Sequence, residues 1–162
     1  MKAKLIIEGK EFSIEIQDQE LQKMLAPPKK TGYERVNKTQ TYWSQAIGGG
    51  VGWCTDCYDN LCDKDYEIAD YYSDKTVAEN NFRADKLMRQ LRRFAVEHRE
   101  NDNPREKYVI YYLKNPGLLQ LRRDETFCFC GPWFDSQHAG AEAIEEFRDE
   151  LIWYFTEYKD SL

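Results

Sequence analysis

Residues 74–99 contain the longest run of helical periodicity in the chain, and this run constrains the fold more than any other feature. At about 100° per residue its apolar side chains fall on one stripe, wide enough to pack on a sheet or on another helix. The stripe consists of Val77, Ala84, Leu87, Met88, Leu91, Phe94 and Ala95. Basic side chains occupy the opposite side. We therefore predict a long amphipathic helix that follows an N-cap at Asp74 and turns a basic face to solvent.

The composition excludes several classes of protein. The chain has 162 residues, which suits one domain or two small subdomains that share a core. Its net charge of −6 argues against general nucleic-acid binding through phosphate neutralisation. No apolar run approaches the about 20 residues of a membrane helix, and the start of the chain lacks a signal-peptide pattern. We expect a cytoplasmic protein with no membrane association, whose five cysteines are reduced thiols or metal ligands.

The first 26 residues predict a small appended unit. Two β-prone runs around Gly9 indicate a β-hairpin over residues 2–16. Asp18 is placed to cap a short helix, which ends at Pro27 because proline has no backbone N–H to donate. A linker then leads to the main domain, expected over residues 33–162.

The main domain is predicted to be α+β, with antiparallel β-hairpins packed against two long amphipathic helices. One hairpin is expected from strands over 41–45 and 51–55, joined by a glycine triplet. The other is expected from strands over 107–113 and 118–122, turned by Asn115-Pro116-Gly117. Further β-prone runs lie at 33–36, 66–72 and 126–130. The last helix is predicted from an N-cap at Ser136 to about Tyr158.

A weak internal repeat divides this domain into two β-hairpin-plus-helix units, residues 33–100 and 107–162. In both units an aromatic pair and a capping residue precede the helix. Tyr71-Tyr72-Ser73-Asp74 opens the first helix, and Trp133-Phe134-Asp135-Ser136 opens the second 62 residues later. Neither unit has enough apolar surface to be stable alone, so we expect them to share a core.

The two long helices carry outer faces of opposite charge. Residues 75–99 hold seven basic and three acidic side chains, and residues 136–162 hold two basic and seven acidic ones. The helices can pair with each other, pair across the two-fold axis of a homodimer, or simply face water. Phe82 and Trp153 depart from the apolar stripes of their helices. Aromatic side chains exposed among charges are typical anchors of protein interfaces, although an N-terminal element can cover them instead.

The cysteines offer one candidate metal site. Cys54 and Cys57 form a CxxC pair, and Cys128 and Cys130 form a CxC pair whose side chains point the same way in a strand. Together they supply four thiolates for zinc if their strands are neighbours. A full zinc motif has two CxxC knuckles, however, so small buried thiols are the more common interpretation. We expect no cofactor.

Catalytic patterns are absent from the sequence. The chain has two histidines, His98 and His138, and each lies near the end of a predicted helix. No GxSxG, HExxH or other nucleophile–base motif is present. We therefore expect a protein that is not an enzyme.

Two binding surfaces remain as hypotheses. Acidic runs over 56–74 and 142–150 resemble a phosphate backbone in charge and predict docking into a basic channel of another protein. The residues predicted to make this contact are Asp63, Asp65, Glu142, Glu145 and Asp149, with Phe82 or Trp153 as the anchor. The alternative is a small nucleic-acid or nucleotide binder that uses the basic face of the 75–99 helix. Its contact residues are Arg83, Lys86, Arg89 and Arg93.

Three stretches of the chain carry a resemblance to known proteins. They are KKTGYERV at 29–36, YYSDKTVAENNFRADKLMRQLRRFAVEHRE at 71–100, and AIEEFRDELIWYFTEYKDSL at 143–162. Together they resemble a group of small phage and prophage proteins of Gram-positive bacteria that have no assigned function. The segment with the glycine triplet and cysteines departs from this pattern, which argues against a metal role for Cys54 and Cys57. Small acidic phage proteins include anti-CRISPR and other anti-defence inhibitors, so the resemblance implies an inhibitor of a host protein.

Overall fold

A computed structural model describes residues 2–7, 10–15, 19, 30–100, 106–124 and 132–158 of the chain. The chain divides into two compact units, Met1–Thr31 and Gly32–Leu162. The first unit contains an antiparallel hairpin of β1 (Lys2–Ile7) and β2 (Lys10–Glu15), with Leu5 opposite Phe12. This hairpin was predicted. The short helix predicted after Asp18 and the boundary predicted at residue 26 lie outside the described residues.

The second unit begins with an antiparallel hairpin of β3 (Thr41–Gln45) and β4 (Val51–Thr55), as the turn residues predicted. Trp43 and Trp53 oppose each other in its register. Gly49 and Gly50 in the connecting loop have φ of 87° and 95°, a left-handed conformation that glycine adopts without steric cost. The β-prone run over 33–36 forms no strand.

Helix α2 (Asn60–Glu67) was missed by the sequence analysis. Asp59 caps it by accepting hydrogen bonds from the backbone N–H groups of Leu61 and Cys62, each at 3.0 Å. Cys62 is the one buried residue of α2, so the sequence of α2 has no apolar stripe from which a helix could be predicted. The strand predicted over 66–72 is therefore wrong, apart from a bridge at Tyr72.

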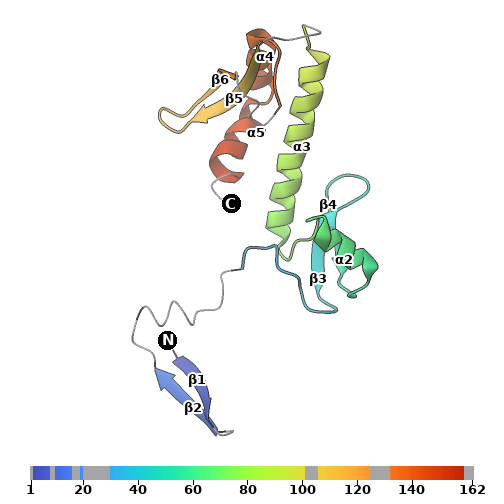
Figure 1. Cartoon of the computed structure of the whole chain (residues 1–162), viewed down its shortest axis with the longest axis vertical. Coiled ribbons are helices and arrows are strands. Elements are labelled where there is room, and N and C mark those ends of the chain that lie inside the picture. Colours follow the sequence, from blue (N-terminus) through green and yellow to red (C-terminus); the bar gives the residue numbers. More distant parts are fainter. Residues whose placement is uncertain are drawn as a thin grey trace. The chain divides into compact units, whose positions relative to one another are not determined.

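Helix α3 (Lys75–Glu97) confirms the predicted central helix. The Asp74 carboxylate accepts from the backbone N–H groups of Thr76 and Val77, and His98 is the C-cap residue. The buried residues of α3 are Ala78, Ala84, Leu87, Leu91 and Phe94. Helix α3 contacts the β3–β4 hairpin near its beginning and the helices of the second half near its end (Figure 1).

The second half contains the antiparallel hairpin of β5 (Lys107–Leu113) and β6 (Leu118–Asp124), followed by α4 (Gln137–Glu146). Ser136 caps α4 by accepting from the Ala139 N–H at 3.1 Å, as predicted. The β-prone run over 126–130 lies outside the described residues.

The last helix is not continuous, contrary to prediction. Phe147, with φ −107° and ψ 18°, separates α4 from α5 (Arg148–Trp153), and a π-helical turn η1 (Tyr154–Tyr158) follows. The Phe147 ring packs edge-on against Phe94, with ring centroids 5.7 Å apart. Beyond this break Leu151, Tyr154 and Phe155 still pack against the hydrophobic core.

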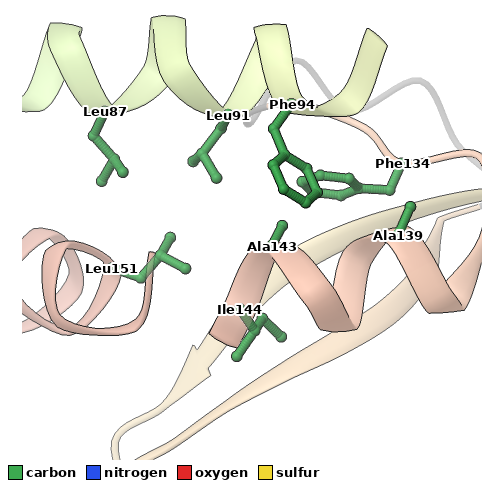
Figure 2. Close-up of a cluster of buried hydrophobic side chains, with 8 residues drawn as sticks. All are labelled: Leu87, Leu91, Phe94, Phe134, Ala139, Ala143, Ile144 and Leu151. Carbon is green, nitrogen blue, oxygen red and sulfur yellow. The ribbon is translucent and has the colours of Figure 1, made fainter. Parts of the chain in front are cut away.

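The main core lies between α3, the helices α4 and α5, and the β5–β6 hairpin (Figure 2). Helix α3 contributes Leu87, Leu91 and Phe94 from one side, and the second half contributes the remaining members of the cluster. Those members are Phe134, Ala139, Ala143, Ile144 and Leu151. Because the cluster draws on both halves of Gly32–Leu162, burial of apolar surface couples α3 to the β5–β6 hairpin.

A smaller core of polar aromatic residues stabilises the first half. Tyr42 and Tyr71 stack with ring centroids 4.1 Å apart, beside the buried Cys62. Asp56 lies next to Tyr71 and has no exposed surface. Arg35 binds the Asp56 carboxylate through Nε at 3.0 Å and Nη2 at 3.3 Å, and the Tyr71 hydroxyl donates to it at 2.8 Å. The buried charge is therefore paired and hydrogen-bonded.

Both halves share one local arrangement ahead of their long helix. Tyr72 exchanges two backbone hydrogen bonds with Trp43 in β3, at 2.8 and 2.9 Å. Phe134 exchanges two with Tyr108 in β5, at the same distances. Tyr72 and Phe134 each precede their N-cap residue by two positions, so the 62-residue offset seen in the sequence recurs in the bridges.

Gly140 marks a close approach of α4 to β6. A Cβ at this position would lie 2.6 Å from Cδ2 and 2.9 Å from Cδ1 of Leu121. Alanine in place of glycine normally stabilises a helix by about 1 kcal/mol, but overpacking costs about 1–3 kcal/mol. We expect Gly140→Ala to lower the free energy of unfolding by about 1 kcal/mol in urea denaturation. Adding Leu121→Val should recover part of this loss, whereas a more stable single variant would contradict the close approach.

Candidate binding site on an acidic face

The outer side of α4 and the start of α5 form an acidic face, defined by Glu142, Glu145, Glu146 and Asp149. All four side chains are exposed. Ala139, Ala143 and Ile144 of α4 are buried against the core, and helical spacing then directs the glutamates to the other side. The core contacts of α4 therefore fix which way these carboxylates point.

A shallow hollow of about 570 Å³ lies between the acidic face and the end of α3. Its lining consists of Phe94, His98, Ala141, Glu142, Glu145 and Glu146. The His98 ring stacks on Phe94, with centroids 3.7 Å apart, and its Nδ1 lies 3.0 Å from the Phe94 carbonyl oxygen. The hollow thus combines aromatic and methyl surface with three carboxylates at its edge.

The carboxylates of the acidic face have only weak local partners. Glu142 Oε1 lies 3.3 Å from His138 Nε2, and Glu145 forms an ion pair with Arg148 one turn further on. Exposed pairs of this kind contribute little free energy. Glu146 and Asp149 have no ion pair within the described part of the chain. Cationic groups of another molecule can therefore approach this face at low cost.

The spacing of the carboxylates suits organic cations better than a metal ion. Among the described residues, no group of three or more His, Cys, Asp or Glu side chains is arranged to hold a metal. Lysine and arginine side chains instead need an apolar surface for the stem and a separate carboxylate for the charged head. Ala141 and the exposed His98 ring, which is stacked on the buried Phe94, supply the first, and the three glutamates supply the second.

The acidic run over 56–74 serves the fold of the first half. Asp63 Oδ1 lies 2.6 Å from Nη1 of Arg35, and Asp65 accepts a hydrogen bond of 2.8 Å from the Tyr42 hydroxyl. Both carboxylates are half-buried. Asp63 and Asp65 were predicted as partner contacts together with Glu142, Glu145 and Asp149. In the structure these two aspartates bind Arg35 and Tyr42 and are not part of the acidic face.

Of the two predicted anchors, Trp153 is not exposed as the sequence suggested. Its side chain is buried, and the Arg83 guanidinium lies 3.8 Å from its ring centroid. Arg83 of α3 and Tyr158 of η1, whose ring centroid lies 5.6 Å from that of Trp153, cover this side chain. Phe82 is half-buried on α3, and a partner contact there stays a prediction.

The predicted basic face of α3 is partly engaged within the molecule. Arg83 forms a two-bond ion pair with Glu150, at 2.8 and 3.0 Å. Arg93 Nε lies 3.8 Å from Glu97, while Lys86 and Arg89 are exposed. Among the described residues, the opposite outer charges of the two helices meet at Arg83–Glu150.

The predicted zinc ligands are only partly within the described residues. Cys54 and Cys57 are exposed, and Cys62 is buried with its Sγ accepting from the Cys57 N–H at 3.4 Å. Cys128 and Cys130 lie outside the described residues. The four-cysteine site therefore stays a prediction.

Comparison with known proteins adds no relative. No protein-family model matches the chain, and neither the curated proteins nor the solved structures contain a match.

Among the described residues, no helix has the length and apolarity to span a membrane. Glu142 and Glu145 were predicted from the sequence as contact residues, but Phe94 and His98 were not, because their side chains meet α4 only in the folded chain.

Proposed function

We propose that this protein is a non-enzymatic binding protein that docks its acidic face onto a basic surface of another protein. The observation that supports this most is the hollow between α3 and α4, where three glutamates surround an apolar floor. Lysine or arginine side chains fit such a hollow by packing their stems on Ala141 and the His98 ring. The carboxylates then form charge-assisted hydrogen bonds with the cationic heads.

The partner we propose is a protein that handles nucleic acid. Such proteins present arrays of lysine and arginine for phosphates, and carboxylates spaced along a helix can occupy those positions. Docking there would block access of the nucleic acid. The resemblance to phage proteins favours a host defence protein, such as a CRISPR–Cas component, as the target of an inhibitor of this kind.

Charge reversal of the acidic face tests this proposal. We expect the triple variant Glu142→Lys, Glu145→Lys and Asp149→Lys to bind a fluorescent nona-arginine peptide at least about tenfold more weakly than the unmodified protein. Each exposed ion pair contributes up to about 1 kcal/mol, and reversal replaces attraction with repulsion. Fluorescence anisotropy at several salt concentrations measures the affinity, which should fall as salt rises.

A matched control separates this site from net charge. The variant Glu67→Lys, Glu79→Lys and Glu157→Lys changes the net charge equally at exposed positions outside the acidic face. It should retain most of the affinity. Equal losses in both variants, or binding that salt does not weaken, would reject the acidic face as the docking site.

A further inference from the structure

A second groove, of about 300 Å³, lies along another side of the same end of α3. One wall is a stripe on α3, and the other is the chain segment that leads to α4. The lining consists of Arg92, Ala95, Val96, Arg99, Pro132 and Trp133. At about 100° per residue this stripe lies roughly 130° around α3 from Phe94 and His98, so it shares no residue with the acidic hollow.

The arginines of this groove, like Arg89 and Arg122, lack a carboxylate partner among the described residues. Elsewhere in the described chain most guanidinium groups have a carboxylate partner: Arg35, Arg83, Arg93, Arg123 and Arg148 are all ion-paired. Arg92 and Arg99 are exposed and have no ion pair within the described residues. Two uncompensated cations therefore flank one groove.

An aromatic ring and a third cation complete the surface. Lys107 Nζ lies 4.3 Å from the centroid of the Trp133 ring, which forms the wall opposite the arginines. Ala95 and Val96 place apolar surface between Arg92 and Arg99, and Val96 is 67% exposed. The groove therefore offers guanidinium groups, an indole ring and aliphatic surface side by side.

This combination matches the chemistry of a nucleotide. Guanidinium groups bind phosphate with two parallel hydrogen bonds, and aromatic rings stack on any of the bases. Arg92 lies near the end of α3 and Arg99 follows its C-cap residue His98, and both line the groove, so each can meet a different phosphate of a strand.

We propose that this groove binds a nucleotide, either free or as a unit of single-stranded nucleic acid. The phosphate lies between Arg92 and Arg99, and the base packs against Trp133. The net charge of −6 opposes a polyanion at long range, but at about 0.1 M salt the screening length of about 10 Å shortens the reach of distant carboxylates. This site is independent of the proposed docking through the acidic face.

The test compares charge reversal in the groove with charge reversal elsewhere. Binding of a fluorescein-labelled oligothymidylate in 0.1 M NaCl is measured by anisotropy for the full chain. We expect Arg92→Glu with Arg99→Glu to weaken binding at least about tenfold and to reduce the slope of log affinity against log salt by about 1.4. The control Lys38→Glu with Lys64→Glu, of equal charge change at exposed positions, should lose far less.

Two further experiments identify the ligand. Trp133→Leu, which keeps apolar volume but removes the indole, should weaken binding about tenfold while thermal unfolding shows the variant folded. Competition by thymidine monophosphate would assign the groove to free nucleotides, and competition by unlabelled oligonucleotide alone would assign it to strands. Equal loss in the groove and control variants, no binding of either ligand, or equally tight binding of polyglutamate would overturn the proposal.

Discussion

Replacing Phe134 with alanine is expected to lower the free energy of unfolding by about 4 kcal/mol, the largest loss we predict for a single substitution. The Phe134 side chain is 1% exposed and lies in the main core with Phe94, Ala139 and Ala143 (Figure 2). Removing a buried phenyl ring costs its transfer free energy and leaves a cavity, together about 3–5 kcal/mol. Urea denaturation followed by circular dichroism measures the change.

The same substitution at Phe82 is the matched control. Phe82 is half-buried and lies outside both buried clusters, so Phe82→Ala should cost less than about 1.5 kcal/mol. The backbone bridge between Phe134 and Tyr108 does not involve the phenyl ring, so the difference between the variants reports packing. Equal losses at the two positions would contradict the core described above.

Asp56→Asn is expected to cost about 3 kcal/mol. The substitution keeps the size of the side chain but removes the charge that faces Arg35 and the acceptor that receives the Tyr71 hydroxyl. Breaking a buried ion pair by changing one partner costs about 3–5 kcal/mol, and the low end applies because Arg35 keeps some exposure and Asp63 as a second partner. Asp59→Asn, which keeps a helix cap at an exposed site, should cost far less.

The same residue makes stability depend on acidic pH. Burial alone would raise the pKa of Asp56, but hydrogen bonds from Arg35, the Tyr58 N–H and Tyr71 outweigh it and lower the pKa from 3.8 to about 2. The unfolded chain therefore binds a proton more readily than the folded one. The contribution of Asp56 to the free energy of unfolding should be constant above about pH 4 and should fall as the pH is lowered from about 4 to 2. In Asp56→Asn this part of the pH dependence should disappear, and an unchanged acid transition would contradict the pairing.

Local signals predicted the elements that local chemistry determines. The glycines between β3 and β4 mark a turn, and Asp74 and Ser136 cap their helices because each accepts a backbone N–H in the first turn. The apolar stripe of α3 follows the 3.6-residue period closely, so its buried residues were largely foreseen. The capping residue of α2, Asp59, was also visible, but without an apolar stripe it was not distinguishable from the other aspartates around it.

Long-range contacts explain what the sequence did not predict. Asp56 binds Arg35, 21 residues away, so the sequence left it in an acidic run that was predicted to dock onto a partner, although it is fully buried. Trp153 was misplaced because Arg83 of α3 covers its ring, a contact between helices that are far apart in the chain. The acidic hollow needs α3 and α4 side by side, and their pairing is decided by the whole core.

The most direct test of the proposed docking is a residue-by-residue map of where a basic ligand binds. Amide chemical shifts of the ¹⁵N-labelled protein, followed by NMR while nona-arginine peptide is added, supply this map. Our account predicts that the largest shifts fall on α4, the start of α5 and the end of α3 around Phe94 and His98, with little change in α2. Shifts centred on the acidic residues around Asp63 and Asp65, or spread evenly over all exposed carboxylates, would contradict it.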